Sequence, residues 1–73
     1  MGNIGAWDFC TMAAQCINRL AGQAIYRAIG QRVIYKLQLL CSDNGAIVRY
    51  PSDTEILEVI DAIKKEMTGS GSI

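Results

Sequence analysis

The sequence predicts an α+β domain in two layers: a long N-terminal helix, a two-stranded antiparallel hairpin and a C-terminal amphipathic helix. Three observations predict it. Polar side chains recur every three or four positions over residues 7–29, an Asn44-Gly45 dipeptide separates two apolar stretches, and a helix-capping pattern begins at Ser52. We expect both helices to pack on the apolar face of the hairpin.

The chain is short for a folded domain. Its 73 residues are 51% hydrophobic, which favours a folded domain over a disordered chain. A chain of this length buries only about 60% of its unfolded surface, so its stability is marginal unless something supplements the core. We assign residues 1–68 to one small domain and interpret the Gly- and Ser-rich residues 69–73 as a flexible tail.

Residues 7–29 are predicted to form the first helix. Opposite its polar stripe lies a wider apolar face, made largely of small residues that would let another element approach closely. Gly30 is the expected C-terminal stop, because glycine adopts the left-handed conformation without strain. A break at Gly22 is the alternative, since glycine inside a helix costs up to ~1 kcal/mol relative to alanine. The polar stripe keeps its phase through Gly22, which favours one helix.

The hairpin is predicted from residues 32–41, which alternate between two faces, and from the returning residues 46–50. Asn44-Gly45 suits a type I′ turn, whose two central residues both need positive φ. The resulting register pairs Asp43 with Ala46, Cys41 with Val48, and Leu39 with Tyr50.

This register leaves residues 32–38 without an in-chain partner, unless residues 3–6 pair with them. Pro51 ends the second strand because it has no amide hydrogen to donate. An unpaired apolar strand invites association, so we expect a second copy of the chain to pair with it.

Residues 52–67 are predicted to form the last helix. Ser52 and Glu55 make a capping box, in which each side chain can bond the backbone amide of the other residue. Gly69 is the expected stop. The apolar stripe of this helix comprises Ile56, Val59, Ile60, Ile63 and Met67.

The net charge is zero, but the charges are separated along the chain. Residues 1–52 carry five basic and two acidic side chains, whereas residues 53–73 carry five acidic and two basic ones. We expect these two parts, with net charges of +3 and −3, to attract each other within a chain or between chains.

Nothing in the composition points to catalysis. Histidine, the commonest general base and metal ligand, is missing, and Cys10, Cys16 and Cys41 have neither metal-ligand nor disulfide spacing. We therefore expect no enzymatic activity, no cofactor and no metal, with reduced cysteines in a cytoplasmic setting. No apolar stretch is long enough to span a bilayer, so we expect no membrane partner.

The favoured function is a non-enzymatic protein-interaction, regulatory or inhibitor module that acts as a homo-oligomer, most simply a dimer, and that can bind another protein. The candidate self-association residues are Val33, Tyr35 and Leu37 on the unpaired strand, and Ile17, Leu20 and Ala24 on the first helix.

The alternative function is a small DNA- or RNA-binding regulator. The predicted register places Arg32, Lys36 and Arg49 on one outer face of the hairpin, where they could contact phosphates. Arg19 and Arg27 complete the candidate contacts with nucleic acid or a protein partner. This basic face has no aromatic residue for base stacking, so nucleic acid is not the favoured partner.

Two local resemblances are present. Residues 23–29, followed by Arg32 and an Ile34-Tyr35 strand, resemble the recognition helix and first strand of phage Cro-type repressors. Residues 34–67 are similar to the opening hairpin and helix of ubiquitin-like folds. Neither resemblance carries functional residues into this chain.

Overall fold

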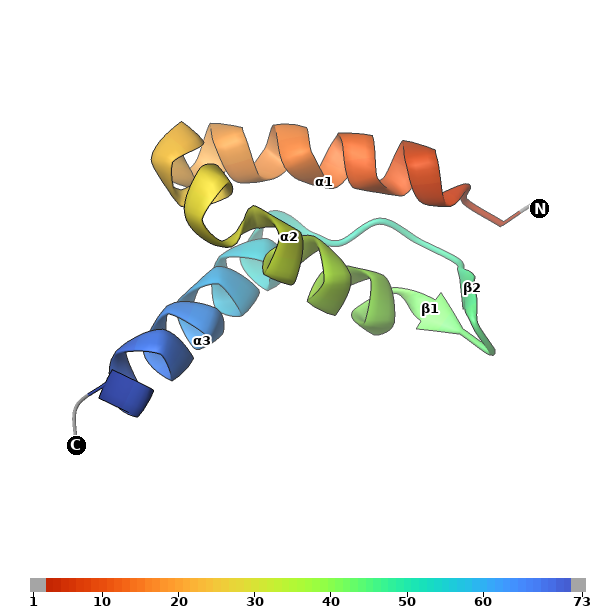
Figure 1. Ribbon diagram of the computed structural model, residues 1–73. Helices are drawn as coiled ribbons and strands as arrows, with labels where there is room; N and C mark the ends of the chain where they lie inside the picture. The colour runs from red at the N-terminus through yellow and green to blue at the C-terminus, as the bar shows by residue number, and fades with distance from the viewer. Residues whose placement is uncertain (1–2, 72–73) are drawn as a thin grey trace.

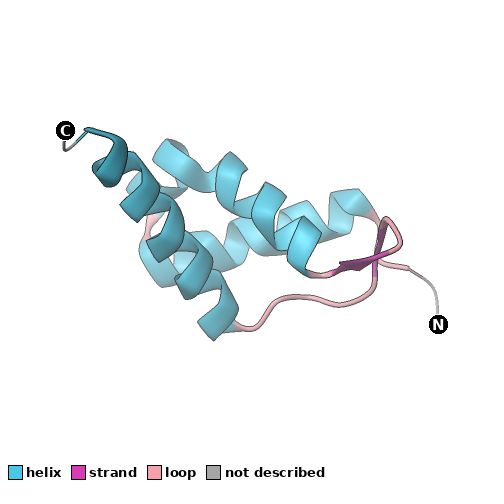
Figure 2. Cartoon of the chain, turned by 90° about the horizontal axis from the view of Figure 1, so that it is seen from below, coloured by secondary structure: helices cyan, strands magenta, loops and turns pink. Residues whose placement is uncertain are grey.

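The computed structural model describes residues 3–71 and shows a small α+β fold with three helices and a two-stranded antiparallel hairpin (Figure 1). The elements in chain order are α1 (Ala6–Ala21), α2 (Gln23–Leu40), β1 (Ser42–Asp43), β2 (Ala46–Ile47) and α3 (Asp53–Gly71). α1 and α2 run in opposite directions, and the hairpin lies at the end away from their junction (Figure 1). The segment after β2 returns along the helices to the start of α3 (Figures 1 and 2).

The prediction of one helix over residues 7–29 is wrong, because the chain breaks at Gly22. This glycine has φ 95° and ψ 162°, a conformation outside the helical region. Its amide donates to the Asn18 carbonyl at 3.0 Å, and its carbonyl accepts from the Tyr26 amide at 3.1 Å. Gly22 therefore closes α1 and opens α2, whereas the expected stop, Gly30, lies inside α2.

The predicted strand over residues 32–41 is also wrong, since α2 continues to Leu40. Val33, Leu37 and Cys41 alternate along a strand, but their spacing of four residues equally places them on one side of a helix. All three are buried in the structure. A helix satisfies its own backbone hydrogen bonds, so this segment needs no strand partner from a second copy. The Ile34-Tyr35 strand implied by the Cro-type resemblance is therefore not formed, and the hairpin implied by the ubiquitin-like resemblance is reduced to Ser42–Asp43 and Ala46–Ile47.

The hairpin turn is confirmed. Asn44 and Gly45 both have positive φ, 56° and 83°, and Asp43 pairs with Ala46 as predicted. The Val48 amide donates to the Cys41 carbonyl at 2.9 Å. Further pairing stops there, because Leu39, the predicted partner of Tyr50, belongs to α2.

One backbone hydrogen bond joins the segment before α1 to the hairpin. The Ile4 amide donates to the Ile47 carbonyl at 2.9 Å. Residues 3–6 form no strand pairing with residues 32–38, the in-chain alternative to a second copy, because those residues belong to α2.

The capping box of α3 is confirmed by two hydrogen bonds. The Glu55 amide donates to Ser52 Oγ at 3.2 Å, and the Ser52 amide donates to Glu55 Oε1 at 2.8 Å. α3 ends at Gly71 and not at Gly69, so it includes the first three residues of the expected tail. Residues 72–73 lie outside the described residues.

The core lies between the three helices, and not between helices and a sheet face as predicted. The hairpin strands are only two residues long each, too short to form such a face. The ring of Phe9 also stacks on that of Tyr50, with centroids 6.0 Å apart, which fastens the returning segment to α1. The buried core comprises Phe9, Ala13, Ile17, Ile29, Val33, Ile34, Leu37, Cys41, Ile56, Ile60 and Ile63.

Candidate interaction surface

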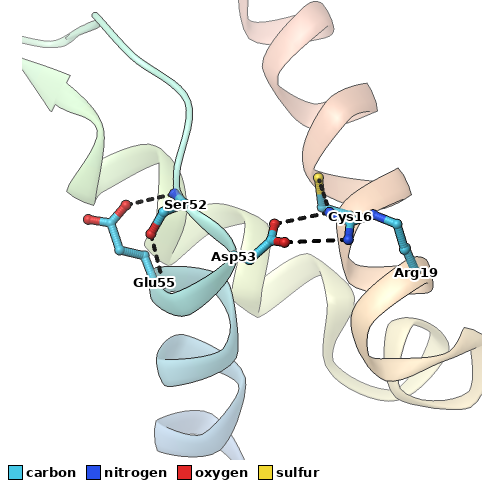
Figure 3. A network of polar contacts seen from close by, with 5 residues as sticks. All are labelled: Cys16, Arg19, Ser52, Asp53 and Glu55. Atoms are coloured by element: carbon cyan, nitrogen blue, oxygen red, sulfur yellow. Dashed lines mark hydrogen bonds and ion pairs between the residues drawn. The ribbon is translucent and has the colours of Figure 1, made fainter.

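Polar contacts concentrate at the N-terminus of α3. Arg49 donates to both carboxylate oxygens of Glu55, with Nη1–Oε1 and Nη2–Oε2 distances of 2.9 Å. The Arg49 guanidinium, together with the Ser52 amide, lowers the pKa of Glu55 to about 2. The bonds between Ser52 and Glu55 are drawn in Figure 3. This cluster holds the returning segment against the first turn of α3.

A second ion pair joins α1 to α3. Arg19 Nη2 lies 3.0 Å from Asp53 Oδ1, and Arg19 also donates to Cys16 Sγ at 3.8 Å (Figure 3). With Arg49–Glu55, this pair links the basic part of the chain to the acidic part. The expected attraction between the two parts therefore operates within one chain at these pairs.

The remaining predicted bases, Arg27, Arg32 and Lys36, all lie on α2. None of them forms an ion pair with any residue of the described range 3–71. Arg49 lies in the segment after β2 and is engaged by Glu55. The structure therefore does not form the predicted basic hairpin face, because Arg32 and Lys36 are helical.

The predicted self-association residues divide into two groups. Ile17, Val33 and Leu37 are fully buried in the core, so they cannot meet a second copy. They were assigned to a surface because the sequence was interpreted as a strand and a wide helix face. Leu20 is half-buried, and Tyr35 and Ala24 are exposed.

A second apolar stripe runs along the solvent side of α2. It consists of the exposed residues Ala24, Ala28, Tyr35 and Leu39, which we call the outer face of α2, with the exposed polar residue Gln31 between Ala28 and Tyr35. At 100° per residue these four positions share one side of the helix, opposite the buried core residues. Tyr35 is 60% exposed and Leu39 57%. Helices that are apolar on two sides are usually covered on both.

Basic residues border the outer face on both of its long edges. The same helical geometry places Arg27 along one edge, and Arg32 and Lys36 along the other. All three are exposed. The arrangement resembles the charged flanks of a coiled-coil stripe, which select the charge of a partner helix.

A groove of about 570 Å³ lies between α1 and α2. Trp7 at its rim is 82% exposed and was missed by the sequence analysis. The available signal was its position four residues before Thr11, at the end of the polar stripe of α1. The groove is lined by the uncharged residues Trp7, Cys10, Thr11, Ala14, Gln15, Asn18, Tyr26, Gln31 and Ile34.

The cysteines lie in three separate environments and are all free. Cys10 Sγ accepts a hydrogen bond from Gln38 Nε2 at 3.2 Å, Cys16 contacts Arg19, and Cys41 is buried. Burial raises the pKa of the Cys41 thiol. Within residues 3–71, no three Cys, Asp or Glu side chains gather in a way that could hold a metal ion.

No helix of the described residues combines the length and hydropathy needed to cross a bilayer. Comparison with protein families, with curated proteins and with solved structures finds no match to this chain.

Proposed function

We propose that this chain is a small, non-enzymatic protein-interaction module of the cytoplasm. It acts as a homo-oligomer, most simply a dimer, and has a regulatory or inhibitory role toward a protein partner. The outer face of α2 carries this proposal, because Tyr35 and Leu39 expose large apolar side chains on a helix that already contacts both other helices. Exposed apolar patches of this kind are typical of protein–protein contacts.

The small size of the chain supports self-association. Below about 70–80 residues a single core seldom supplies more than a few kcal/mol, and oligomerisation is one of the usual supplements. Among residues 3–68, the large side chains that are fully buried are few: Phe9, Ile17, Leu37, Ile56, Ile63, Val33 and Cys41. Covering the outer face of α2 would add apolar burial that one copy lacks.

Size-exclusion chromatography with light scattering, over a concentration series in the micromolar range, tests the proposal. We expect a mass near twice 8.0 kDa, and we expect Leu39→Ser to shift the equilibrium toward the monomer. Met12→Ser is the matched control, because Met12 is a large exposed apolar residue on α1. A monomer at every concentration would overturn the proposal.

Nucleic-acid binding is the second candidate, now through α2 instead of the hairpin. The supporting observation is that Arg27, Arg32 and Lys36 form no ion pair within residues 3–71 and share a helix that has no acidic residue. Phosphate contacts of this kind weaken steeply with salt. A gel shift with mixed DNA and RNA should then show salt-sensitive binding that Arg32→Glu/Lys36→Glu abolishes. No binding at low salt would remove this candidate.

A further inference from the structure

We infer that the dimer is built by the outer face of α2 in one copy lying against the acidic side of α3 in the other, with the contact formed twice about a two-fold axis. We define the acidic side of α3 by Glu58, Ala62 and Glu66. This inference rests on the proposed self-association and names the surfaces that produce it.

The charge of α2 decides against the simplest dimer, in which two outer faces meet. The 18 residues of α2 include Arg27, Arg32 and Lys36 and no acidic side chain. Two such faces in contact would bring uncompensated positive charges together, which is a destabilising arrangement at an interface. The outer face therefore requires an acidic partner surface.

The acidic side of α3 offers that surface. Glu58 and Glu66 form no ion pair among residues 3–71, whereas Asp53, Glu55 and Asp61 are each paired within the chain. Every side chain from residue 64 to 68 is exposed, and the C-terminal end of α3 points away from the hairpin end of the molecule (Figures 1 and 2). This part of α3 is thus accessible to a second copy.

The two surfaces also match in shape and spacing. Ala62 is exposed and lies between Glu58 and Glu66 on one side of α3, while the neighbouring base Lys65 is paired with Asp61 within the chain. On α2, the outer face is flanked by bases, and with the glutamates placed opposite Arg27 and Lys36 the small side chain of Ala62 lies between the levels of Ala28 and Tyr35. Glu58 and Glu66 are roughly 12 Å apart along their helix axis, close to the roughly 13 Å that separates Arg27 and Lys36.

A charge-swap experiment tests this arrangement. The first variant is Arg27→Glu/Lys36→Glu, the second is Glu58→Lys/Glu66→Lys, and circular dichroism confirms that both remain helical. Each variant alone should self-associate at least about tenfold more weakly than the wild type, since both of its contacts then oppose like charges. Mixed in equal amounts, the two variants should form a heterodimer, because each contact regains opposite charges.

A variant that removes the basic charges without reversing them keeps the test valid if the charge-reversed variants misfold. With Arg27→Ala/Lys36→Ala, self-association should weaken if α2 meets α3, but strengthen if two α2 helices meet. If the wild type dimerises and Glu58→Lys/Glu66→Lys dimerises equally well, this inference is overturned, but the proposed self-association still holds. A monomeric wild type would overturn both.

Discussion

Arg49 and Glu55 form a two-pronged ion pair at the start of α3, with both nitrogen–oxygen distances at 2.9 Å. The same carboxylate accepts a hydrogen bond from the Ser52 amide at 2.8 Å. Glu55 therefore completes the capping box and also holds the segment after β2 against the first turn of α3. The Glu55 side chain therefore has two roles: it caps α3 with Ser52, and it binds Arg49, six residues earlier in the chain.

The first prediction concerns pH. The pKa of Glu55 in the folded chain is lowered to about 2 from an ordinary value of 4.5, so folding favours the ionised carboxylate. Its stabilisation is present above the unfolded pKa and is lost as the pH falls from about 4.5 toward about 2. The melting temperature of the wild type should fall more steeply over this window than that of Glu55→Gln.

Asp43→Asn is the matched control for that measurement, because Asp43 forms no ion pair among residues 3–71 and lies outside both proposed contact surfaces. Its melting temperature should follow the wild-type pH profile. If Glu55→Gln also kept the wild-type slope, the ion pair with Arg49 would contribute nothing to folding.

The second prediction concerns the capping hydroxyl. Ser52→Ala removes the acceptor for the Glu55 amide and should lower the free energy of unfolding by about 1 kcal/mol. Thr54→Ala is the control, since Thr54 makes no hydrogen bond through its side chain within the described chain. Urea denaturation should separate the two midpoints, and equal midpoints would mean that the cap is not formed in solution.

The sequence allowed α3 and the turn to be predicted because their signals are local. Ser52 with Glu55, and Asn44 with Gly45, specify hydrogen bonds or backbone angles among near neighbours. Residues 32–40 differ, because Val33 and Leu37 satisfy both a two-residue and a four-residue period. Whether these residues form a strand or a helix depends on how they pack against α1 and α3. The absence of an in-chain partner for the predicted strand was the available sign of the helix.

The candidate interaction surface was predictable only in part, for the same reason. Arg32 and Lys36 were predicted to lie on the outer face of a hairpin, whereas both lie on α2. Trp7 was missed because only the contact between α1 and α2 creates the groove beside it. Gly22 ends a helix, as was predicted for Gly30, and Gly30 lies inside a helix, as was predicted for Gly22. A substitution at each of these two glycines leads to a prediction.

Gly22→Ala should lower the free energy of unfolding by about 1–3 kcal/mol, because φ 95° is strained for a side chain with a Cβ atom. Nothing lies within 4 Å of the added methyl group, so the cost arises from the backbone alone. Gly5→Ala is the control, since Gly5 has φ −67° and only one ordinary contact for a methyl group. Equal effects of both substitutions on the urea midpoint would contradict the break at Gly22.

Gly30→Ala should destabilise the chain for a different reason. An added Cβ atom would lie 2.5 Å from Tyr26 Cδ1 and 3.2 Å from Cγ, so the ring must leave its place in the helix pair. With the ring removed by Tyr26→Ala, the same substitution should instead stabilise α2 by up to about 1 kcal/mol, the helix preference of alanine over glycine. Urea denaturation of the four chains gives the coupling energy between the two positions. An effect of Gly30→Ala that is the same with and without the tyrosine would show that the ring does not pack on this glycine.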